Sequence, residues 1–398
     1  MGLNVEKLRN DFTILSKTIN KKPIIYMDSA CMSLKPKCVV DKITEYYNEY
    51  PACSGRSAHK LAKKVEDEVH DARKEISKFI CASKQEEIVF TRNTTEGINL
   101  VSNSLGLKKG DNVLTSDKEH NSGLIPFQIL AKKGISHNVF TFSNVEDFKK
   151  KLTKNTKLVS FVMTSNVDGT TQPVREMIRI AHDNGSLVLL DGAQHVPHEE
   201  TNVKKLDCDF LAFSGHKMCG PTGTGILYGK MDCLKKLDQF MVGGETVKNS
   251  TYTSFEPEDI PMKFEAGLQD YAGILGLSEA AKYLKKVGLD NIKSHEQKLS
   301  KFIYDELISN CNNEIILLGD GKNGVISFNV KGLNYHEVSG ILNETKNIMV
   351  RSGMHCVHSW FNKNKLPGSV RASLYFYNTK EECDILIEEV KKVCEFGK

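Results

Sequence analysis

The sequence predicts an α/β protein built on a mostly parallel sheet with helices on both faces. Two observations lead to this fold class: a globular composition, with 40% hydrophobic and 26% charged residues over 398 residues, and short apolar runs that alternate with amphipathic segments. A chain of this length fits two or three domains. Nearly continuous apolar runs between helices are typical of strands that are buried on both faces.

Strands and helices of this sheet are expected to alternate between residues 87 and 228. We expect strands at 87–91, 112–115, 157–164, 186–191, 210–214 and 225–228. We expect helices at 95–104, 122–133 and 174–184, with Gly185 ending the last of them.

The composition shifts after Gly276, and a smaller α+β domain is expected from there onward. Its expected helices are 277–286, 290–308, 335–343 and 380–396, and its expected strands are 314–318, 324–330 and 371–377. A helix near 6–17 is expected to pack with it. We therefore predict a large domain at 21–280 and a small domain made of 1–20 and 281–398.

Charge and cysteine usage argue against several classes of protein. The net charge is only +4, from 54 basic and 50 acidic residues, so no direct nucleic-acid partner is expected. No apolar run reaches the ~18 residues of a membrane span, and residues 1–20 lack an apolar signal-peptide core. The 11 cysteines are odd in number and form no C-x-x-C pair, which argues against a disulfide framework or a zinc ribbon. A cytoplasmic location is expected.

Lys217 lies in a segment, 211–225, that reads LAFSGHKMCGPTGTG. The lysine comes just after a buried strand, and α/β sheets bind ligands at the carboxyl ends of their strands. A lysine amine forms Schiff bases with aldehydes once burial or a nearby cation lowers its pKa. The alternative is a solvated loop lysine.

Asp191 ends a wholly apolar strand in the segment LVLLDGAQHVPH at 187–198. A carboxylate at this position suits the protonated ring nitrogen of pyridoxal phosphate, which is the better electron sink in that form. Asp191 precedes Lys217 by one strand–crossover–strand unit. The alternative is a helix N-cap.

A phosphate site is indicated by FTRNTTEGINL at 90–100, where a strand leads into a helix. Backbone N–H groups at the helix N-terminus and the hydroxyls of Thr94 and Thr95 can bind an anion, although plain capping would need the same residues. His120 follows the next strand and can stack on a pyridine ring, although a loop histidine often has no such role. The joint occurrence of these groups at strand ends favours a pyridoxal-phosphate enzyme.

The ordered set FTRNTTEGINLV, EH, SNVDGT, DGAQ and DFLAFSGHKMCGPTGTGILY resembles class V pyridoxal-phosphate-dependent transferases. It is most similar to the SUF-type (group II) cysteine desulfurases and the related selenocysteine lyases. The resemblance runs from about Asp11 to RASLYFYNT at 371–379, and SGHK…GPTG is its most specific part. It implies a type I fold, with a seven-stranded, mostly parallel sheet in the large domain, and a homodimer with sites at the subunit interface.

The resemblance also implies roles for individual residues around the cofactor. Lys217 forms the Schiff base, His120 stacks on the ring, and Asp191 pairs with the ring nitrogen. Asn166 and Gln194 lie near the ring oxygen. The phosphate is held by Thr95, Ser214 and His216.

Cys356 lies in VRSGMHCVHSWF at 350–361, in a glycine-containing loop of the predicted small domain. Removing sulfur from cysteine needs a thiol nucleophile, and nearby arginines favour its thiolate. The motif R-x-G-x-H-C and the short spacing to Arg371 resemble the group II enzymes. We assign Cys356 as nucleophile and persulfide carrier, Arg371 as the clamp for the substrate carboxylate, and Arg351 as its support. The alternative is an ordinary thiol, and no metal site is expected beside it.

The implied activity converts L-cysteine into L-alanine and passes sulfur to an acceptor protein or iron–sulfur cluster scaffold. A selenocysteine lyase, a class V aminotransferase and an idle scaffold in a sulfur-transfer assembly are the alternatives. Two departures from the family pattern bear on this. Leu268 stands where the family has a phosphate-binding threonine, although Gln269 can substitute for it. The loop at 52–59 also differs, with His59 as its candidate substrate-binding residue.

Overall fold

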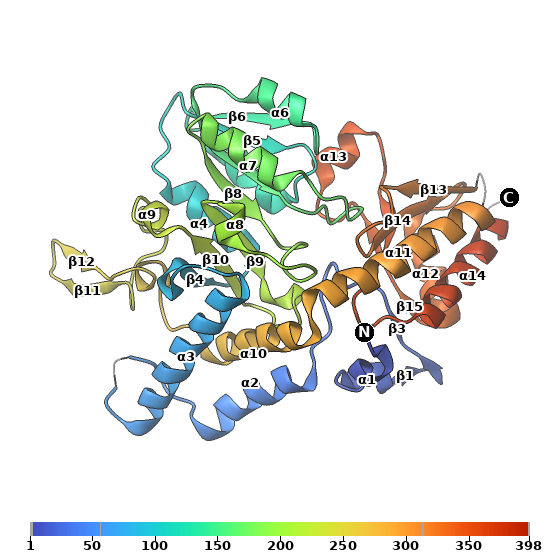
Figure 1. The fold of residues 1–398 in the computed structure, drawn as a ribbon, viewed down its shortest axis with the longest axis horizontal. Coiled ribbons are helices and arrows are strands. Elements are labelled where there is room, and N and C mark those ends of the chain that lie inside the picture. The colour runs from blue at the N-terminus through green and yellow to red at the C-terminus, as the bar shows by residue number, and fades with distance from the viewer. Residues whose placement is uncertain (1–2, 56, 312–313, 397–398) are drawn as a thin grey trace.

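The computed structural model describes residues 3–55, 57–311 and 314–396, and its centre is a seven-stranded sheet (Figure 1). The strand order is β4-β10-β9-β8-β7-β5-β6. β10 runs antiparallel to both of its neighbours, and the other pairs are parallel. The predicted α/β class and the seven-stranded, mostly parallel sheet are therefore confirmed. The strands are β4 (Ile88–Thr91), β5 (Asn112–Ser116), β6 (Ser136–Phe140), β7 (Thr156–Val162), β8 (Leu187–Asp191), β9 (Phe210–Ser214) and β10 (Gly225–Gly229).

Both faces of the sheet are buried, which explains why its strands read as continuous apolar runs. Successive side chains of a strand point to opposite faces. In β8, Val188 and Leu190 therefore enter one hydrophobic cluster, whereas Leu189 enters another. Helix α7 (Val174–Asp183) and helix α10 (Tyr271–Val287) cover the first face, and helix α4 (Thr94–Ser104) and helix α5 (Ile125–Ala131) cover the second.

Further helices surround this core. α2 and α3 pack on α10, and neither helix was predicted from the sequence. Predicted helix 122–133 is shorter in the structure because a 3₁₀ turn, Asn121–Gly123, precedes α5. The remaining elements of this part are α2 (Lys37–Glu49), α3 (Lys60–Phe79), α6 (Val145–Lys151), α8 (Val203–Leu206), α9 (Met231–Leu234) and the hairpin β11 (Val247–Ser250) and β12 (Phe255–Pro257).

The C-terminal part forms a second, antiparallel sheet of order β13-β14-β17-β16 with its own hydrophobic core. Predicted strand 371–377 is instead β17 (Ser369–Ser373), because the chain turns at 375–378, where Asn378 accepts a hydrogen bond from the Tyr375 N–H. The other elements are β13 (Ile315–Leu318), β14 (Val325–Val330), β15 (Ile348–Met349), β16 (Arg351–Gly353), α11 (Leu289–Cys311), α12 (Tyr335–Lys346), α13 (His358–Lys363) and α14 (Lys380–Phe396).

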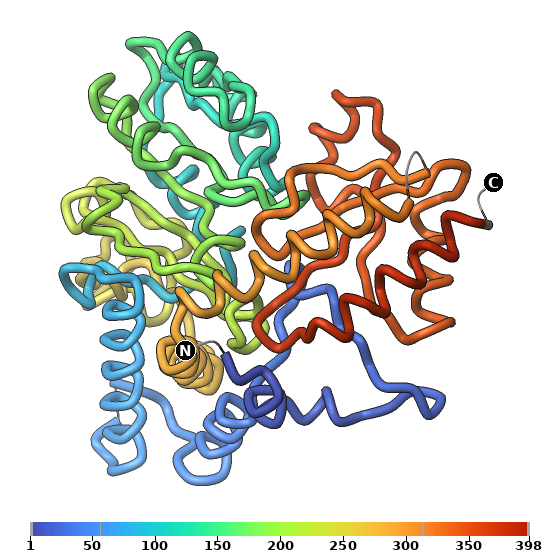
Figure 2. The backbone as a smooth tube through the Cα atoms, turned by 45° about the vertical axis from the view of Figure 1, so that its right-hand side comes forward, coloured from blue at the N-terminus to red at the C-terminus, as the bar shows by residue number. Residues whose placement is uncertain are grey.

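The N-terminal segment joins the two parts, and Figure 2 shows its blue trace running up against the orange and red C-terminal part. Strand β3 (Ile25–Tyr26) pairs in parallel with β15, and Ile25 enters the C-terminal core. The single helix predicted at 6–17 is wrong: helix α1 covers Val5–Arg9 and a separate 3₁₀ turn covers Thr13–Ser16. The break between them places Phe12 in the main core against Tyr377. Two short strands, β1 (Thr18–Ile19) and β2 (Lys22–Pro23), follow.

Helix α10 spans residue 280, and the division of the chain there stays a prediction. Within the described part of the chain, no helix combines the length and apolar character that a membrane crossing requires.

Candidate active site

A cavity of about 250 Å³ lies between the ends of the central strands and the C-terminal sheet. It brings together twelve of the thirteen residues that the sequence singled out. They are Thr94, Thr95, His120, Asn166, Asp191, Gln194, Ser214, His216, Lys217, Arg351, Cys356 and Arg371. Residues of the central sheet and of the C-terminal sheet therefore line one cavity.

Lys217 stands in a short 3₁₀ turn, Gly215–Lys217, directly after β9. Burial lowers the pKa of its ammonium group, while the carboxylate of Asp191 opposes that shift and the guanidinium of Arg371 adds to it. A lysine with a lowered pKa has a larger neutral fraction, which is the form that attacks carbonyl carbon.

Asp191 is the last residue of β8 and is buried at 3% exposure. Its Oδ1 accepts a hydrogen bond of 2.9 Å from the Ala193 N–H, and burial raises the pKa of the carboxyl group. A buried carboxylate whose negative charge is offset by so few neighbouring groups suits a cationic ligand group. Glu119 lies close by, fully buried, with its pKa raised to about 8 by burial and with the Val162 N–H as a donor at 3.0 Å. Sequence reasoning missed Glu119, although it directly precedes His120.

Hydroxyl and backbone donors gather at the N-terminus of α4. The Thr94 and Ser214 hydroxyls are 2.7 Å apart, and the Thr95 and Ser122 hydroxyls are also 2.7 Å apart. The chain packs tightly here, because a Cβ on Gly225 would lie 2.6 Å from the Cα of Asn93. Hydroxyls beside the positive end of an eleven-residue helix fit a phosphate group.

His120 is neutral in this environment. Its Nδ1 accepts a 3.1 Å hydrogen bond from the Ser122 N–H, which assigns the ring proton to Nε2. Burial, with a contribution from Lys217, lowers the pKa of the imidazole to about 3. An uncharged ring is suited to stacking on an aromatic ligand.

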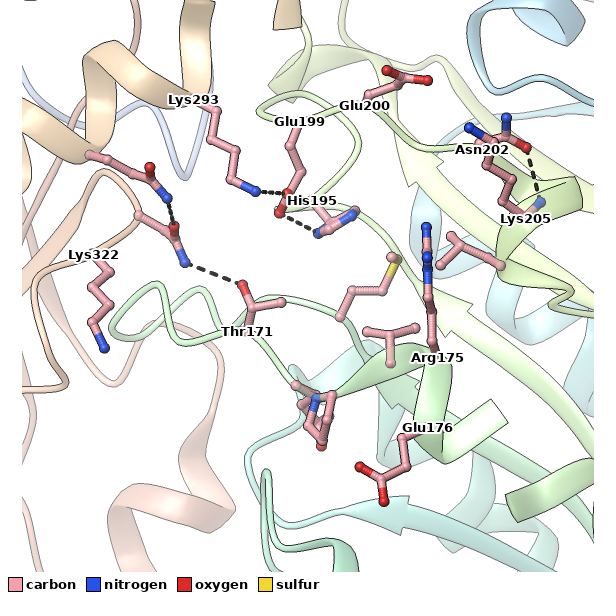
Figure 3. A pocket seen from close by; sticks show the side chains of 17 residues that line it. Thr171, Arg175, Glu176, His195, Glu199, Glu200, Asn202, Lys205, Lys293 and Lys322 are labelled. Carbon is pink, nitrogen blue, oxygen red and sulfur yellow. Dashed lines mark hydrogen bonds and ion pairs between the residues drawn. The ribbon is translucent and has the colours of Figure 1, made fainter. Parts of the chain in front are cut away.

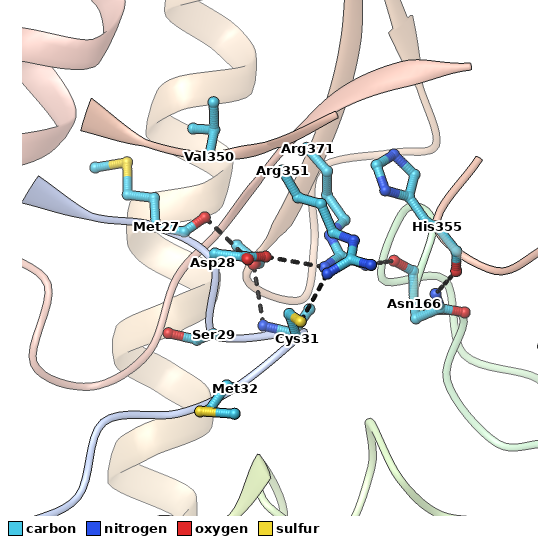
Figure 4. Close-up of polar contacts among 12 residues, drawn as sticks. Met27, Asp28, Ser29, Cys31, Met32, Asn166, Val350, Arg351, His355 and Arg371 are labelled. Atoms are coloured by element: carbon cyan, nitrogen blue, oxygen red, sulfur yellow. Dashed lines mark hydrogen bonds and ion pairs between the residues drawn. The ribbon is translucent and has the colours of Figure 1, made fainter. Parts of the chain in front are cut away.

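Two arginines face each other on the C-terminal sheet, where Arg351 of β16 is the direct partner of Arg371 of β17. Like charges directly opposite one another are destabilising unless anions balance them. The Arg371 Nη2 donates to Asp28 Oδ1 at 3.1 Å and Nη1 donates to the Asn166 carbonyl at 2.9 Å (Figure 4). Its buried Nε has no hydrogen-bond partner among the described residues, which leaves a donor for a ligand carboxylate.

The loop that carries Cys356 is held by the large sheet. His355 and Cys356 both have left-handed backbone angles, with φ of 50° and 60°, which are unfavourable for side chains with a Cβ. Asn166 Nδ2 donates to the His355 carbonyl at 2.7 Å, and the Asn121 N–H donates to the Cys356 carbonyl at 2.7 Å. These two contacts offset the strain and fix the thiol at the cavity.

His59, the thirteenth candidate, lies elsewhere, as do Leu268 and Gln269, which the sequence singled out as a departure from the family pattern. His59 is exposed and is the N-cap of α3, where its Nδ1 accepts from the Ala62 N–H at 3.2 Å. Leu268 is 69% exposed, and the Gln269 amide donates to the carbonyls of Ala266 and Gly267. None of the three lines the cavity.

A larger cavity, of about 740 Å³, shares no lining residue with the first (Figure 3). Its walls carry ion pairs, in which Glu199 binds both His195, at 3.0 Å, and Lys293. No cysteine lines it, and the described residues hold no cluster of three metal-ligating side chains. The smaller cavity is therefore the candidate active site.

Comparison with known proteins agrees with this geometry. The Aminotransferase class-V family matches residues 25–386. A protein of Haloferax volcanii named cysteine desulfurase is 38% identical, over 98% of this chain and 96% of its own length. A cysteine desulfurase of Escherichia coli O8 is also 38% identical, over 99% of both chains.

Solved structures give the same picture. The apo structure of a cysteine desulfurase from Thermococcus onnurineus superimposes with a TM-score of 0.93, at 36% identity and 98% coverage of both chains. The cysteine desulfurase CsdA of Escherichia coli, in its S-sulfonic acid form, gives a TM-score of 0.91 at 29% identity and 99% coverage of both chains. The chain belongs to the class-V aminotransferase family and, within it, to the cysteine desulfurases.

Proposed function

We propose that this enzyme removes sulfur from L-cysteine, releases L-alanine and retains the sulfur as a persulfide on Cys356. One observation carries the proposal: a single small cavity holds an activatable lysine, a buried carboxylate, the Cys356 thiol and two arginines. Each of these groups can perform one step of the reaction. The cofactor of the family is pyridoxal phosphate.

The residues of the cavity fit pyridoxal phosphate. Lys217 offers the amine for its aldehyde, and Asp191 offers the anion for its ring nitrogen. Asn166 and Gln194 would lie near the ring oxygen, His120 would cover the ring, and Thr94, Thr95, Ser214 and His216 would hold the phosphate. When bound, the cofactor supplies an electron sink for the α-carbon of the substrate.

The side chains of this chain would then bind the amino acid and move protons and sulfur. Arg371, with Arg351 beside it, binds the α-carboxylate through its free Nε. The Lys217 amine takes the α-proton. The Cys356 thiolate attacks the substrate sulfur, so that an S–S bond forms, the C–S bond breaks and the electron pair returns to carbon. The Nε2–H of the neutral His120 ring would donate a hydrogen bond at the cavity wall.

The persulfide would next pass to a sulfur acceptor, for which an iron–sulfur cluster scaffold is our first candidate. We also propose a homodimer, in which His59 of the 52–59 loop binds substrate at the partner's site. Apolar side chains exposed along one stretch of chain would be covered by such a partner: Met241, Val242, Phe255, Met262 and Leu268. A reducing compartment such as the cytoplasm suits this chemistry because all eleven cysteines are free thiols.

The test compares wild type with Cys356→Ala after purification with pyridoxal phosphate. We expect both proteins to show the visible absorption of bound cofactor, and only wild type to release alanine from L-cysteine in the presence of a reductant. Cys38→Ala, a half-buried thiol outside the cavity, is the matched control and should stay active. Undiminished alanine release by Cys356→Ala would contradict the proposal and favour a class V reaction that needs no thiol. The same assay with L-selenocysteine measures the preference between sulfur and selenium.

A further inference from the structure

A second thiol, Cys31, lines the same cavity as Cys356. Among the residues that the structure describes, these two are the only cysteines that do so, although the chain has eleven. Cys31 lies in the turn after β3, where its N–H donates to the Asp28 carbonyl at 3.0 Å. The two thiols therefore come from opposite ends of the chain and line one cavity only in the folded protein.

Cys31 lies beside the two arginines that we propose to bind the substrate carboxylate. The Arg351 Nη1 donates to the Cys31 sulfur at 2.7 Å, and Asp28, in the same turn, binds Arg371 (Figure 4). A guanidinium is always charged and has no acceptor atom, so the sulfur accepts this hydrogen bond. Positive charge thus lies beside an atom that must carry negative charge during thiol exchange.

Arg351 connects the two thiols, because its side chain binds Cys31 and its strand leads into the loop that carries Cys356. It begins β16, and the loop with Cys356 follows that strand directly. The buried Nε of Arg371 and Oδ1 of Asn166, both without partners among the described residues, face the same space. These groups would bind the substrate amino acid, and the space between the two thiols would be vacated when alanine leaves.

We propose that Cys31 is a second sulfur carrier, which takes the outer sulfur of the Cys356 persulfide after alanine has left. This inference rests on the proposed function, because the sulfur reaches Cys31 only through Cys356. The Cys31 thiolate attacks the outer sulfur, a new S–S bond forms on Cys31, and the S–S bond on Cys356 breaks. Cys356 leaves as a thiolate, and the proton stays on the transferred sulfur. Nothing is oxidised or reduced overall, so the step needs no further reagent.

The experiment loads the pyridoxal-phosphate holoenzyme with excess L-cysteine without reductant. Bound outer sulfur is then counted by cyanide release, and the modified cysteines are located by alkylation and peptide mass spectrometry. Wild type should carry two such sulfurs per chain, on Cys31 and Cys356. Cys31→Ser should carry one, Cys356→Ala none, and Cys38→Ala, the matched control, two.

The outcomes separate the two proposals. A labelled Cys356 with an unlabelled Cys31 would overturn the relay and leave the proposed function intact. Label on Cys31 in Cys356→Ala would also overturn the relay, because the sulfur would have arrived by another route. A Cys31–Cys356 disulfide with release of sulfide would overturn it as well. Alanine release without any label on Cys356 would remove the proposed function and the relay together.

Discussion

Replacing Arg371 with lysine tests the assignment of the substrate carboxylate. The guanidinium already donates to Asn166 and Asp28 and keeps Nε free, so one residue makes two structural contacts and still has a donor for the ligand. A lysine keeps the charge but has no planar fork, and it cannot serve all three positions together. We therefore expect Arg371→Lys to lose at least one charge-assisted hydrogen bond to the substrate.

The size of this loss follows from the strength of such a bond. A hydrogen bond to a charged group contributes about 1.5–3 kcal/mol, and about 1.4 kcal/mol corresponds to a factor of ten. We expect kcat/KM for L-cysteine to fall by about 10- to 140-fold, mainly through KM, because the carboxylate is bound in both ground and transition states.

The assay measures alanine release against L-cysteine concentration for wild type and Arg371→Lys, with thermal unfolding of both. Arg179→Lys, at an arginine that is 70% exposed in its side chain, is the matched control and should behave as wild type. A change in kcat/KM of less than about threefold in a folded Arg371→Lys would refute the reasoning.

Two further predictions concern the Cys356 loop and the buried imidazoles. Asn166→Ala removes the donor to the His355 carbonyl. The loss of one hydrogen bond, worth about 1.4 kcal/mol, should slow persulfide formation by about tenfold. Cofactor absorption should persist, and an unchanged single-turnover rate would contradict this prediction. Burial lowers the pKa values of His120 to about 3, His216 to about 4 and His355 to about 2. In the unfolded chain the pKa of a histidine is about 6.5, so between about pH 4 and 6.5 these rings are mostly neutral in the native protein and mostly protonated in the unfolded chain. The stability that these three rings contribute should therefore rise with pH from about 4 to 6.5, because in the unfolded state they bind more protons there. Melting curves across this range should show a shallower slope for His355→Asn than for wild type, and equal slopes would contradict the assignment.

Six strands of the central sheet were predictable because they are largely buried, which leaves a nearly continuous apolar signal in the sequence. The edge strand β6 (Ser136–Phe140) was not predicted, because most of its side chains are exposed or half-buried and leave no such signal. β9 was predicted at 210–214 and lies at Phe210–Ser214. The break in the segment predicted as one helix at 6–17 was not predictable, because it occurs where Phe12 turns into a core formed with Tyr377, at the far end of the chain. The helices α2 and α3 were not predicted either, although apolar residues such as Val65, Ala72 and Ile76 recur at helical spacing along α3 and are buried in the structure.

For the candidate site, local sequence determined which groups stand at strand ends. Lys217 and Asp191 follow apolar runs, and the position of a side chain at the end of such a run is a local property. The tertiary structure decided how Arg351 and Arg371 face each other, how Asn166 holds the Cys356 loop, and that Cys31 lines the same cavity. These contacts join residues that are far apart in the chain, and they depend on strand register and on the packing of two sheets. A single sequence carries no direct signal of either, because register is set by the sum of many side-chain contacts rather than by any one segment.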